Sequence, residues 1–410
     1  MSFKAAFRER LAGIYELDST GAKRSLQMEG VRGFAVLLVF FVHYHALFKP
    51  WMSEGSFTFA LSDFLWSIGH TGVDLFFVLS GYLIYGLVIK RRNSYPSFIK
   101  RRILRIYPVF LCVLAIYIAL SLLFPSENKI PAGAGAAGYY ILQNVLLLPG
   151  MISVQPIITV SWSLSYEFFF YLFIPALVAL LAMRRWTPAL RVLFFLTLAV
   201  VYAWHCFASG DERIRLIMFI SGILLFEAMH SYNLGERVKP LTDYLVIAAL
   251  ALTFLMVYVL TGQQGTLSSL PNSDGFKEMY RTLVLFGSFG LLVLTCLSSN
   301  ALLGKIFSWT PLRWLGNMSY SYYLIHGLTL KGIALVAHKI VPSSDSGVMA
   351  FLFGLPPAFG LTLISATLLF IIVEKRFSIP TGAKKQTRSN LLAPVESASL
   401  PVASQESAAT

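Results

Sequence analysis

Apolar segments about as long as a membrane-spanning helix recur along this chain from residue 33 to residue 373. A helix needs roughly 20 mostly apolar residues to cross the hydrocarbon core of a bilayer. Only 13% of the residues are charged, against about 25% in a typical soluble domain. The sequence therefore predicts an all-α fold, a polytopic transmembrane helical bundle of about ten spans. The predicted spans are residues 33–48, 72–89, 106–124, 162–183, 192–207, 216–229, 241–260, 282–297, 315–337 and 349–373.

The distribution of basic residues predicts how the bundle is oriented. Most of the 33 lysines and arginines lie before residue 33, between residues 90 and 105, or after residue 373. Cytoplasmic loops carry an excess of Lys and Arg, so both termini are predicted to be cytoplasmic. We accordingly expect a cytoplasmic N-terminal segment (1–32), a transmembrane domain (33–373) and a cytoplasmic tail (374–410). The tail is rich in Ser, Ala and Pro and is expected to be disordered.

The net charge of +13 does not by itself indicate nucleic acid as a partner. The basic residues alternate with apolar segments, so topology and the anionic lipids of the bilayer account for them. Cys112, Cys206 and Cys296 lie far apart in apolar segments, which predicts neither a disulfide framework nor a metal site. No His-x-x-x-His or His/Cys cluster indicates a bound metal either. The pattern fixes no oligomeric state.

Arg32 and His43 stand at the two ends of the first apolar segment. Ionisable residues inside a membrane span cost free energy, so each one is a candidate for function. Eleven residues at about 100° each return to nearly the same helix face, roughly 16 Å further along the axis. The alternatives are a topology anchor for Arg32 and an interfacial histidine for His43. The unbroken apolar run around His43 favours the functional interpretation for that residue.

Asp74 opens the second apolar segment at about the depth of His43. A carboxylate beside an imidazole fixes the tautomer of the ring and stabilises its protonated form. The alternative is an acidic residue that favours the dipole at a helix N-terminus. From position alone, both interpretations of Asp74 stay open.

Arg101, Arg102 and Arg105 form a basic cluster before the third segment. On a helix Arg101 and Arg105 share a face, and Arg102 flanks it. Clustered guanidinium groups suit phosphate recognition because each can donate two parallel hydrogen bonds. The competing interpretation, which the residues alone favour, is an anchor that binds lipid headgroups.

Two further groups of polar residues lie in the fourth and ninth segments. Ser163 and Glu167 are one helical turn apart, with Tyr166 between them, and Glu167 precedes three phenylalanines. A buried carboxylate there is costly unless it is hydrogen-bonded or functional. Ser319 and His326 are seven residues apart, share a helix face and flank Tyr323. Structural hydrogen bonds are the alternative for both groups.

Five stretches in order resemble acyltransferase family 3, which includes O-antigen, nodulation-factor and exopolysaccharide acetylases. The resemblance covers about residues 26–373. The stretches are Glu-Gly-Val-Arg-Gly (29–33), Gly-Val-Asp-Leu-Phe-Phe-Val-Leu-Ser-Gly-Tyr (72–82), Arg-Arg-Ile-Leu-Arg-Ile-Tyr-Pro (101–108), Trp-Ser-Leu-Ser-Tyr-Glu (162–167) and Gly-Asn-Met-Ser-Tyr-Ser-Tyr-Tyr-Leu-Ile-His (316–326).

The resemblance implies roles for particular residues. Arg32 and His43 match the family's paired Arg and His, and the three arginines at 101–105 match those expected to hold an acyl-CoA, most often acetyl-CoA. Glu167 matches the acidic residue of the family's Ser-x-x-x-Glu motif. The family often continues with a second Glu and a Gln, whereas here Phe168 follows, so Glu167 stands alone in the acidic role.

These observations predict an enzyme that moves an acyl group from acyl-CoA to a carbohydrate hydroxyl in a bacterial inner membrane. His43 would act as general base or acyl carrier, oriented by Asp74, and Glu167 would complete the catalytic group. The alternative is a transporter or flippase of a glycan or acyl group, which also needs intramembrane polar residues. The acceptor would be a lipid-linked or exported glycan. Its expected contacts are Ser163, Tyr166, Ser319, Tyr323 and His326.

Overall fold

The computed structural model describes residues 3–17, 25–91, 94–261, 274–298, 301–341 and 347–378. Within these ranges the secondary structure is helical apart from an isolated bridge between Pro149 and Ile152, which confirms the predicted all-α class. The helices that build the bundle are α1 (Phe3–Tyr15), α2 (Leu26–Phe48), α3 (Phe57–Gly69), α4 (Thr71–Lys90), α5 (Tyr95–Leu123), α6 (Ala134–Val145), α7 (Ser161–Leu180), α8 (Pro188–Ser209), η4 (Glu212–Leu216), α9 (Ile217–His230), α10 (Pro240–Thr261), α11 (Asp274–Leu297), α12 (Leu302–Phe307), α13 (Thr310–Asn317), α14 (Ser319–Ile340), α15 (Gly347–Met349), α16 (Leu355–Leu369) and η7 (Phe370–Ser378).

In the described part of the chain, eight helical segments are long and apolar enough to cross a membrane, so the chain is an integral multi-pass membrane protein. Two of the ten predicted spans fall outside this set: α9 has only 14 residues, and α14 carries many polar side chains. The count of ten spans and the orientation of the termini stay predictions. The eight segments are Leu26–Trp51, Phe57–Lys90, Tyr95–Leu123, Ser161–Leu180, Pro188–Ser209, Pro240–Thr261, Gly275–Leu297 and Leu355–Ser378.

Several helices begin earlier than the predicted spans, and two further differences in boundaries bear on the site. The sequence predicted no helix before residue 72 in the second span, but α3 precedes α4 there with only His70 between them. The last helix does not end at Val373 but continues as η7 to Ser378, which buries Glu374 completely. A charged residue marks the end of an apolar run in the sequence, but a buried partner lets the helix continue past it. The predicted disordered tail beyond residue 378 lies outside the described residues.

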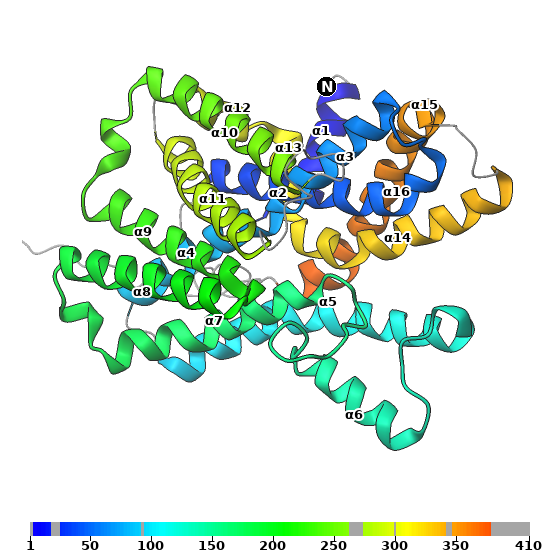
Figure 1. Ribbon diagram of the computed structural model, residues 1–410, viewed down its shortest axis with the longest axis horizontal. Helices are drawn as coiled ribbons and strands as arrows, with labels where there is room; N and C mark the ends of the chain where they lie inside the picture. The colour runs from blue at the N-terminus through cyan, green and yellow to red at the C-terminus, as the bar shows by residue number, and fades with distance from the viewer. Residues whose placement is uncertain are drawn as a thin grey trace, which may run out of the picture.

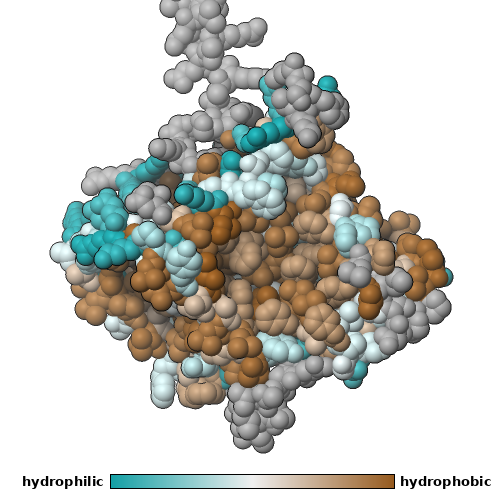
Figure 2. All heavy atoms as spheres, turned by 90° about the horizontal axis from the view of Figure 1, so that it is seen from above, coloured by the Kyte–Doolittle hydropathy of each residue, from teal (hydrophilic) through white to brown (hydrophobic). Residues whose placement is uncertain are grey.

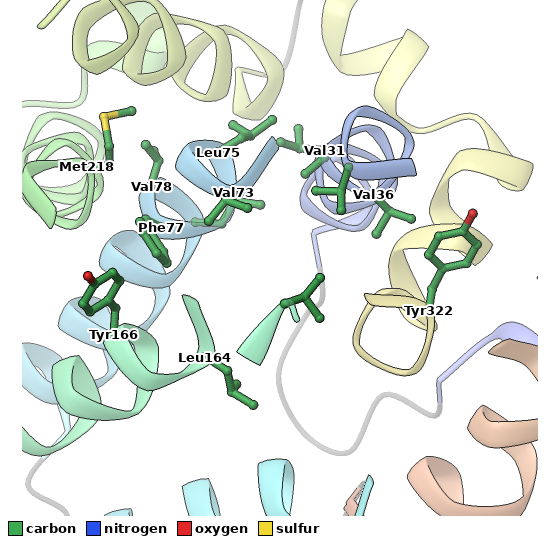
Figure 3. Packing of buried hydrophobic residues seen from close by; sticks show 14 of the residues in the cluster. Val31, Val36, Val73, Leu75, Phe77, Val78, Leu164, Tyr166, Met218 and Tyr322 are labelled. Atoms are coloured by element: carbon green, nitrogen blue, oxygen red, sulfur yellow. The ribbon is translucent and has the colours of Figure 1, made fainter. Parts of the chain in front are cut away.

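The two helices that carry the first two motifs lie at the centre of the bundle. In Figure 1, α2 and α4 lie between α7, α8 and α9 on one side and α14 and α16 on the other. Figure 3 shows apolar side chains of α4 packed between Met218 of α9 and Val31 of α2. Figure 2 shows that hydrophobic residues cover most of the face in view, with hydrophilic residues gathered towards its margins. This distribution is expected for a bundle whose sides contact lipid.

Helices α4 and α9 approach so closely that only glycine fits between their backbones. A Cβ atom added at Gly222 would lie 2.0 Å from the carbonyl oxygen of Val78, and one at Gly81 would lie 2.0 Å from that of Phe219. Small residues at helix interfaces allow this kind of packing in membranes. Gly81 therefore has a packing role within its motif.

We expect Gly222→Ala to destabilise the bundle by about 2 kcal/mol, because the added methyl group must push two backbones apart. Thermal unfolding of the detergent-purified protein measures this loss. Gly287→Ala in α11 is the matched control, since nothing lies within 4 Å of the added Cβ there. Equal unfolding temperatures for the two variants would contradict the close approach of α4 and α9.

Candidate active site

A cavity of about 150 Å³ lies where α2, α4, α5, α7 and α14 meet. These helices are far apart in the sequence, yet each of the five motifs contributes at least one side chain to the lining. The side chains come together because α2 packs against α4 and α14, and α7 packs against α4 and α5. The predicted site residues that line this cavity are Arg32, Arg102, Arg105, Ser163, Glu167, Ser319 and Tyr323.

The three arginines of the cavity differ in how they are held. Arg105 forms an ion pair of 2.7 Å with Glu374. The guanidinium of Arg102 lies over the rings of Phe98 and Tyr171, and its Nε is buried without a hydrogen-bond partner. For Arg32 the structure describes no ion pair or hydrogen bond at all. The cavity therefore presents guanidinium donors that are free to bind an anion.

Glu167 is held by two neutral hydroxyl groups rather than by a cation. Ser80 of α4 donates to its carboxylate at 2.6 Å, and Tyr171, one turn further along α7, donates to the same oxygen. The second carboxylate oxygen has no described hydrogen bond. A carboxylate has about four acceptor sites. Glu167 can therefore accept a further hydrogen bond from a group that enters the cavity.

Hydroxyl groups from α7 and α14 face the same cavity. Ser163 Oγ lies 2.6 Å from the hydroxyl of Tyr323, and both are within hydrogen-bond distance of the carbonyl oxygen of Val160. Ser319 Oγ is buried and has no hydrogen-bond partner among the described residues. An unpaired buried hydroxyl is costly. Because Ser319 lines the cavity, its hydroxyl group is available to a molecule that enters there.

His43 lies against a second histidine, His326 of α14. The Nδ1 of His326 donates to the carbonyl oxygen of Tyr322 at 2.9 Å, so in the neutral ring its Nε2 accepts. That Nε2 lies 3.3 Å from Nδ1 of His43, which also faces the carbonyl oxygen of Val39 at 3.1 Å. A carbonyl oxygen only accepts, so the proton of His43 is on Nδ1. This leaves Nε2 of His43 unprotonated and able to take a proton.

The histidine pair is next to the cavity rather than in its wall. Among the described residues that line the cavity, neither His43 nor His326 is present. The ring of His326 lies 6.1 Å from that of Tyr323, which does line it. The histidine pair thus lies beside a ring that forms part of the cavity wall.

Asp74 contacts a different partner from the one expected. The sequence argument placed its carboxylate beside His43, but the structure pairs it with Arg215 of η4 through two hydrogen bonds of 2.8 and 2.9 Å. Arg215 also donates to the carbonyl oxygen of His70. A bidentate guanidinium is a stronger partner for a buried carboxylate than a neutral imidazole. The group that orients His43 in the structure is therefore His326.

Comparison with known proteins gives a family match that extends over nearly the whole helical bundle. Residues 25–374 match the acyltransferase domain that defines acyltransferase family 3.

The chain belongs to acyltransferase family 3.

Curated relatives of this family member are bacterial. This chain is 25% identical to the "O-acetyltransferase OatA" of Staphylococcus aureus over 327 residues. The alignment covers 73% of this chain and 49% of that protein. The chain is 26% identical to the "Peptidoglycan O-acetyltransferase OatA" of Listeria monocytogenes, with 73% and 48% covered. A putative O-acetyltransferase of S. aureus is 24% identical, with 85% and 56% covered. The chain thus spans about half the length of these relatives. No solved structure matches it.

Besides Asp74 and the histidine pair, two predicted site residues lie outside the cavity of this family member. Arg101 is exposed on α5 and donates to Ser97. Tyr166 is buried beside Phe77 and lines a second pocket at the start of α7. The sequence argument placed Arg101 and Arg105 on one face of the helix, but the structure brings Arg105 into the cavity together with Arg102, three residues before it, and leaves Arg101 outside.

Four residues to which the sequence argument gave no role complete the site. Tyr171 and Ser80 bind Glu167, Glu374 pairs with Arg105, and Arg215 pairs with Asp74. Two of them had a signal in the sequence: Ser80 lies within the stretch 72–82, and Tyr171 follows Glu167 by one helical turn. Within the described ranges, the structure groups no three His, Cys, Asp or Glu side chains in a position to hold a metal ion.

Proposed function

We propose that this membrane acyltransferase moves an acetyl group from cytoplasmic acetyl-CoA to a hydroxyl of an exported or lipid-linked glycan. The observation that carries the proposal is the cavity that joins guanidinium donors, free hydroxyl groups and Glu167 next to the His43–His326 pair. The names of the relatives support an O-acetyl product. The Listeria relative is named for peptidoglycan, which supports a cell-wall glycan as acceptor and a bacterial inner membrane as location.

In this proposal the arginines bind the donor. A volume of about 150 Å³ is too small for a nucleotide, since sites for drug-sized ligands measure about 300–1,000 Å³. The nucleotide phosphates therefore stay at the cytoplasmic mouth near Arg102 and Arg105, and only the narrow thioester end enters. Arg32 lies on the same face of α2 as His43, so in this proposal the thioester end passes Arg32 on its way from the phosphate site to His43.

The acceptor hydroxyl gives its proton to Nε2 of His43 as its oxygen attacks the thioester carbonyl. The new C–O bond forms, the C–S bond breaks, and the departing thiolate takes the proton from the imidazolium. Ser319 and Tyr323 are the proposed donors to the oxyanion, because their hydroxyl groups face the cavity. Glu167 and Ser163 are the proposed contacts for the acceptor. In the alternative chemistry, Nε2 of His43 first carries the acetyl group itself.

The donor site is tested by a matched pair of neighbouring arginines. We expect Arg102→Gln to raise the KM for acetyl-CoA by about tenfold or more, because one charge-assisted phosphate contact is worth about 1.5–3 kcal/mol. Arg101→Gln removes the same charge from the exposed side of α5 and is expected to change KM by less than about twofold. Both are measured by release of the CoA thiol from acetyl-CoA in the presence of crude lipid-linked glycan.

The same assay separates the proposal from transport. Acceptor-dependent release of thiol by the wild type supports group transfer. Equal KM values for the two arginine variants would contradict the binding of acetyl-CoA at this cavity. A folded wild type that releases no thiol from several acyl-CoA donors, with a broad acceptor extract, would favour a transporter or flippase.

A further inference from the structure

A second and much larger pocket opens at the other end of the bundle from the arginine motif. It has a volume of about 1210 Å³ and lies between the start of α7, the end of α8, η4, and the facing ends of α10 and α11. In the predicted orientation this end faces away from the cytoplasm. The pocket is large enough for a sugar with its substituents, because drug-sized ligands occupy about 300–1,000 Å³.

Cations outnumber acids in the wall of this pocket. Arg213 is paired with Asp211 at the rim, and Arg215 is paired with Asp74 behind the wall. The charged side chains of the lining are Asp211, Arg213, Arg215, Lys277, Glu278 and Arg281. Arg281 is paired with Glu278, so each of the three arginines already has one carboxylate partner, and an anionic ligand would bind to the donors that these pairs leave unused.

Arg281 is the residue that points most directly to a ligand. Its side chain is only 9% exposed, although it lines the pocket. One terminal nitrogen donates to Glu278 at 2.6 Å, while Nε is buried without a hydrogen-bond partner. Lys277 lies one turn before it on α11 and is also buried. A guanidinium with an unsatisfied donor is suited to a phosphate or carboxylate, which accepts two parallel hydrogen bonds.

Aromatic rings from α7 complete the wall. The guanidinium of Arg215 lies 5.4 Å from the ring centre of Trp162, and Tyr166 packs edge-on to the same ring at 5.9 Å. Both aromatic residues line the pocket. Large rigid rings provide apolar area for the C–H face of a sugar at low entropic cost.

The first turn of α7 contributes to the walls of both cavities. Trp162 lines the larger pocket, and the next residue, Ser163, lines the smaller cavity of the arginine motif. Adjacent residues of a helix point about 100° apart, so the two cavities lie on different sides of this turn. The larger pocket is thus a neighbour of the smaller cavity, at the end of the bundle where the proposed function expects the acceptor.

We infer that the larger pocket is the acceptor site, and that Arg281 selects an acceptor that carries a phosphate or carboxylate group. The inference rests on the proposed function, because only that function makes the bound molecule an acceptor. The binding of an anionic sugar to this pocket can nevertheless be measured without any reaction. The shared chemistry is an oxyanion. It can come from an acid group of the glycan or from the diphosphate of a lipid carrier.

The test measures the binding of three probes to the detergent-purified full chain by quenching of tryptophan fluorescence. The probes are a disaccharide with one carboxylate, its neutral methyl ester, and inorganic pyrophosphate. We expect Arg281→Gln to weaken the binding of an anionic probe by about tenfold, which corresponds to about 1.4 kcal/mol, and to leave the ester unchanged. Arg101→Gln is the matched control, since Arg101 is exposed on α5 and does not line this pocket.

Each outcome has a defined meaning. Preference for the acid disaccharide over its ester, lost in Arg281→Gln, supports a glycan acid. The same loss with pyrophosphate alone supports the diphosphate of a carrier. Equal binding of acid and ester together with no binding of pyrophosphate would overturn the inference. Arg281→Lys, which keeps the charge and removes the planar guanidinium, repeats the test if Arg281→Gln does not fold. The binding test contains no acyl donor, so its outcome is independent of the thiol-release assay. The proposed function can fail while the binding of the anion is confirmed, and the binding of the anion can fail while acetyl transfer is confirmed.

Discussion

Replacing His43 with alanine is expected to lower kcat for acetyl transfer by about 10²–10⁴-fold while the protein stays folded. The expectation follows from the proton positions of the histidine pair. Nδ1 of His43 is committed to Val39 and His326, so Nε2 is the basic nitrogen. His43 is only partly buried and forms no ion pair among the described residues, so its removal leaves no unpaired charge. The measurement is thiol release under saturating donor and acceptor, with the unfolding temperature recorded for each variant.

Two comparisons make the His43 result specific. His205→Ala, at an exposed position on α8, controls for the loss of an imidazole elsewhere and is expected to keep wild-type kcat. A folded His43→Ala variant with wild-type kcat would exclude both the base and the carrier role. To separate these two roles, labelled acetyl-CoA is added without acceptor and the protein is quenched. Label that remains on the wild type but not on His43→Ala indicates an acetyl-histidine.

The sequence could predict the gathering of the site because few residue types are tolerated inside a bilayer. Arg32, Glu167 and His326 stand out against apolar neighbours, and each such residue needs a partner or a function. In the structure Arg32 and Glu167 line one cavity, and His326 lies beside it. Helical periodicity did not give the inward face of α5, since it grouped Arg101 with Arg105, whereas the structure groups Arg102 with Arg105.

Partners across helices could not be predicted, because depth along a span does not fix which neighbour a side chain meets. Asp74 has the depth of His43, yet the rotation of α4 and the position of η4 bring Arg215 to it instead. Arg215 lies in a short turn after α8, where an arginine looks like any loop residue. The role of Glu374 was not predicted for a related reason. It follows an apolar run, so in the sequence it resembled the end of a span rather than a buried partner of Arg105.

The short helix α9 shows a different limit. Its 14 residues do not reach across a bilayer at about 1.5 Å each. It is nevertheless buried on most sides, because α4, α8 and α11 surround it and the paired glycines let α4 approach. Hydropathy alone indicates an apolar segment here, and only packing shows that protein rather than lipid covers it.

The Asp74–Arg215 pair gives the second large effect. We expect Asp74→Asn and Arg215→Gln each to destabilise the protein by about 3–5 kcal/mol, because either change leaves the other charge buried without its counterion. The double variant removes both charges and is expected to lose less than the sum of the two single losses, by about 1–3 kcal/mol. Thermal or denaturant unfolding in detergent measures the four proteins of this cycle.

The exposed pair Asp211–Arg213 supplies the matched cycle, since the two residues are bonded with similar geometry but Arg213 is 47% exposed. Its coupling is expected to stay within about 0–1 kcal/mol. Additive losses in the Asp74–Arg215 cycle would contradict a direct pair. A coupled result has a consequence for the site: Asp74 then acts by holding Arg215 over Trp162. Substitution of Asp74 would then lower the rate of acetyl transfer by disturbing the wall of the proposed acceptor pocket, and not by changing the orientation of His43.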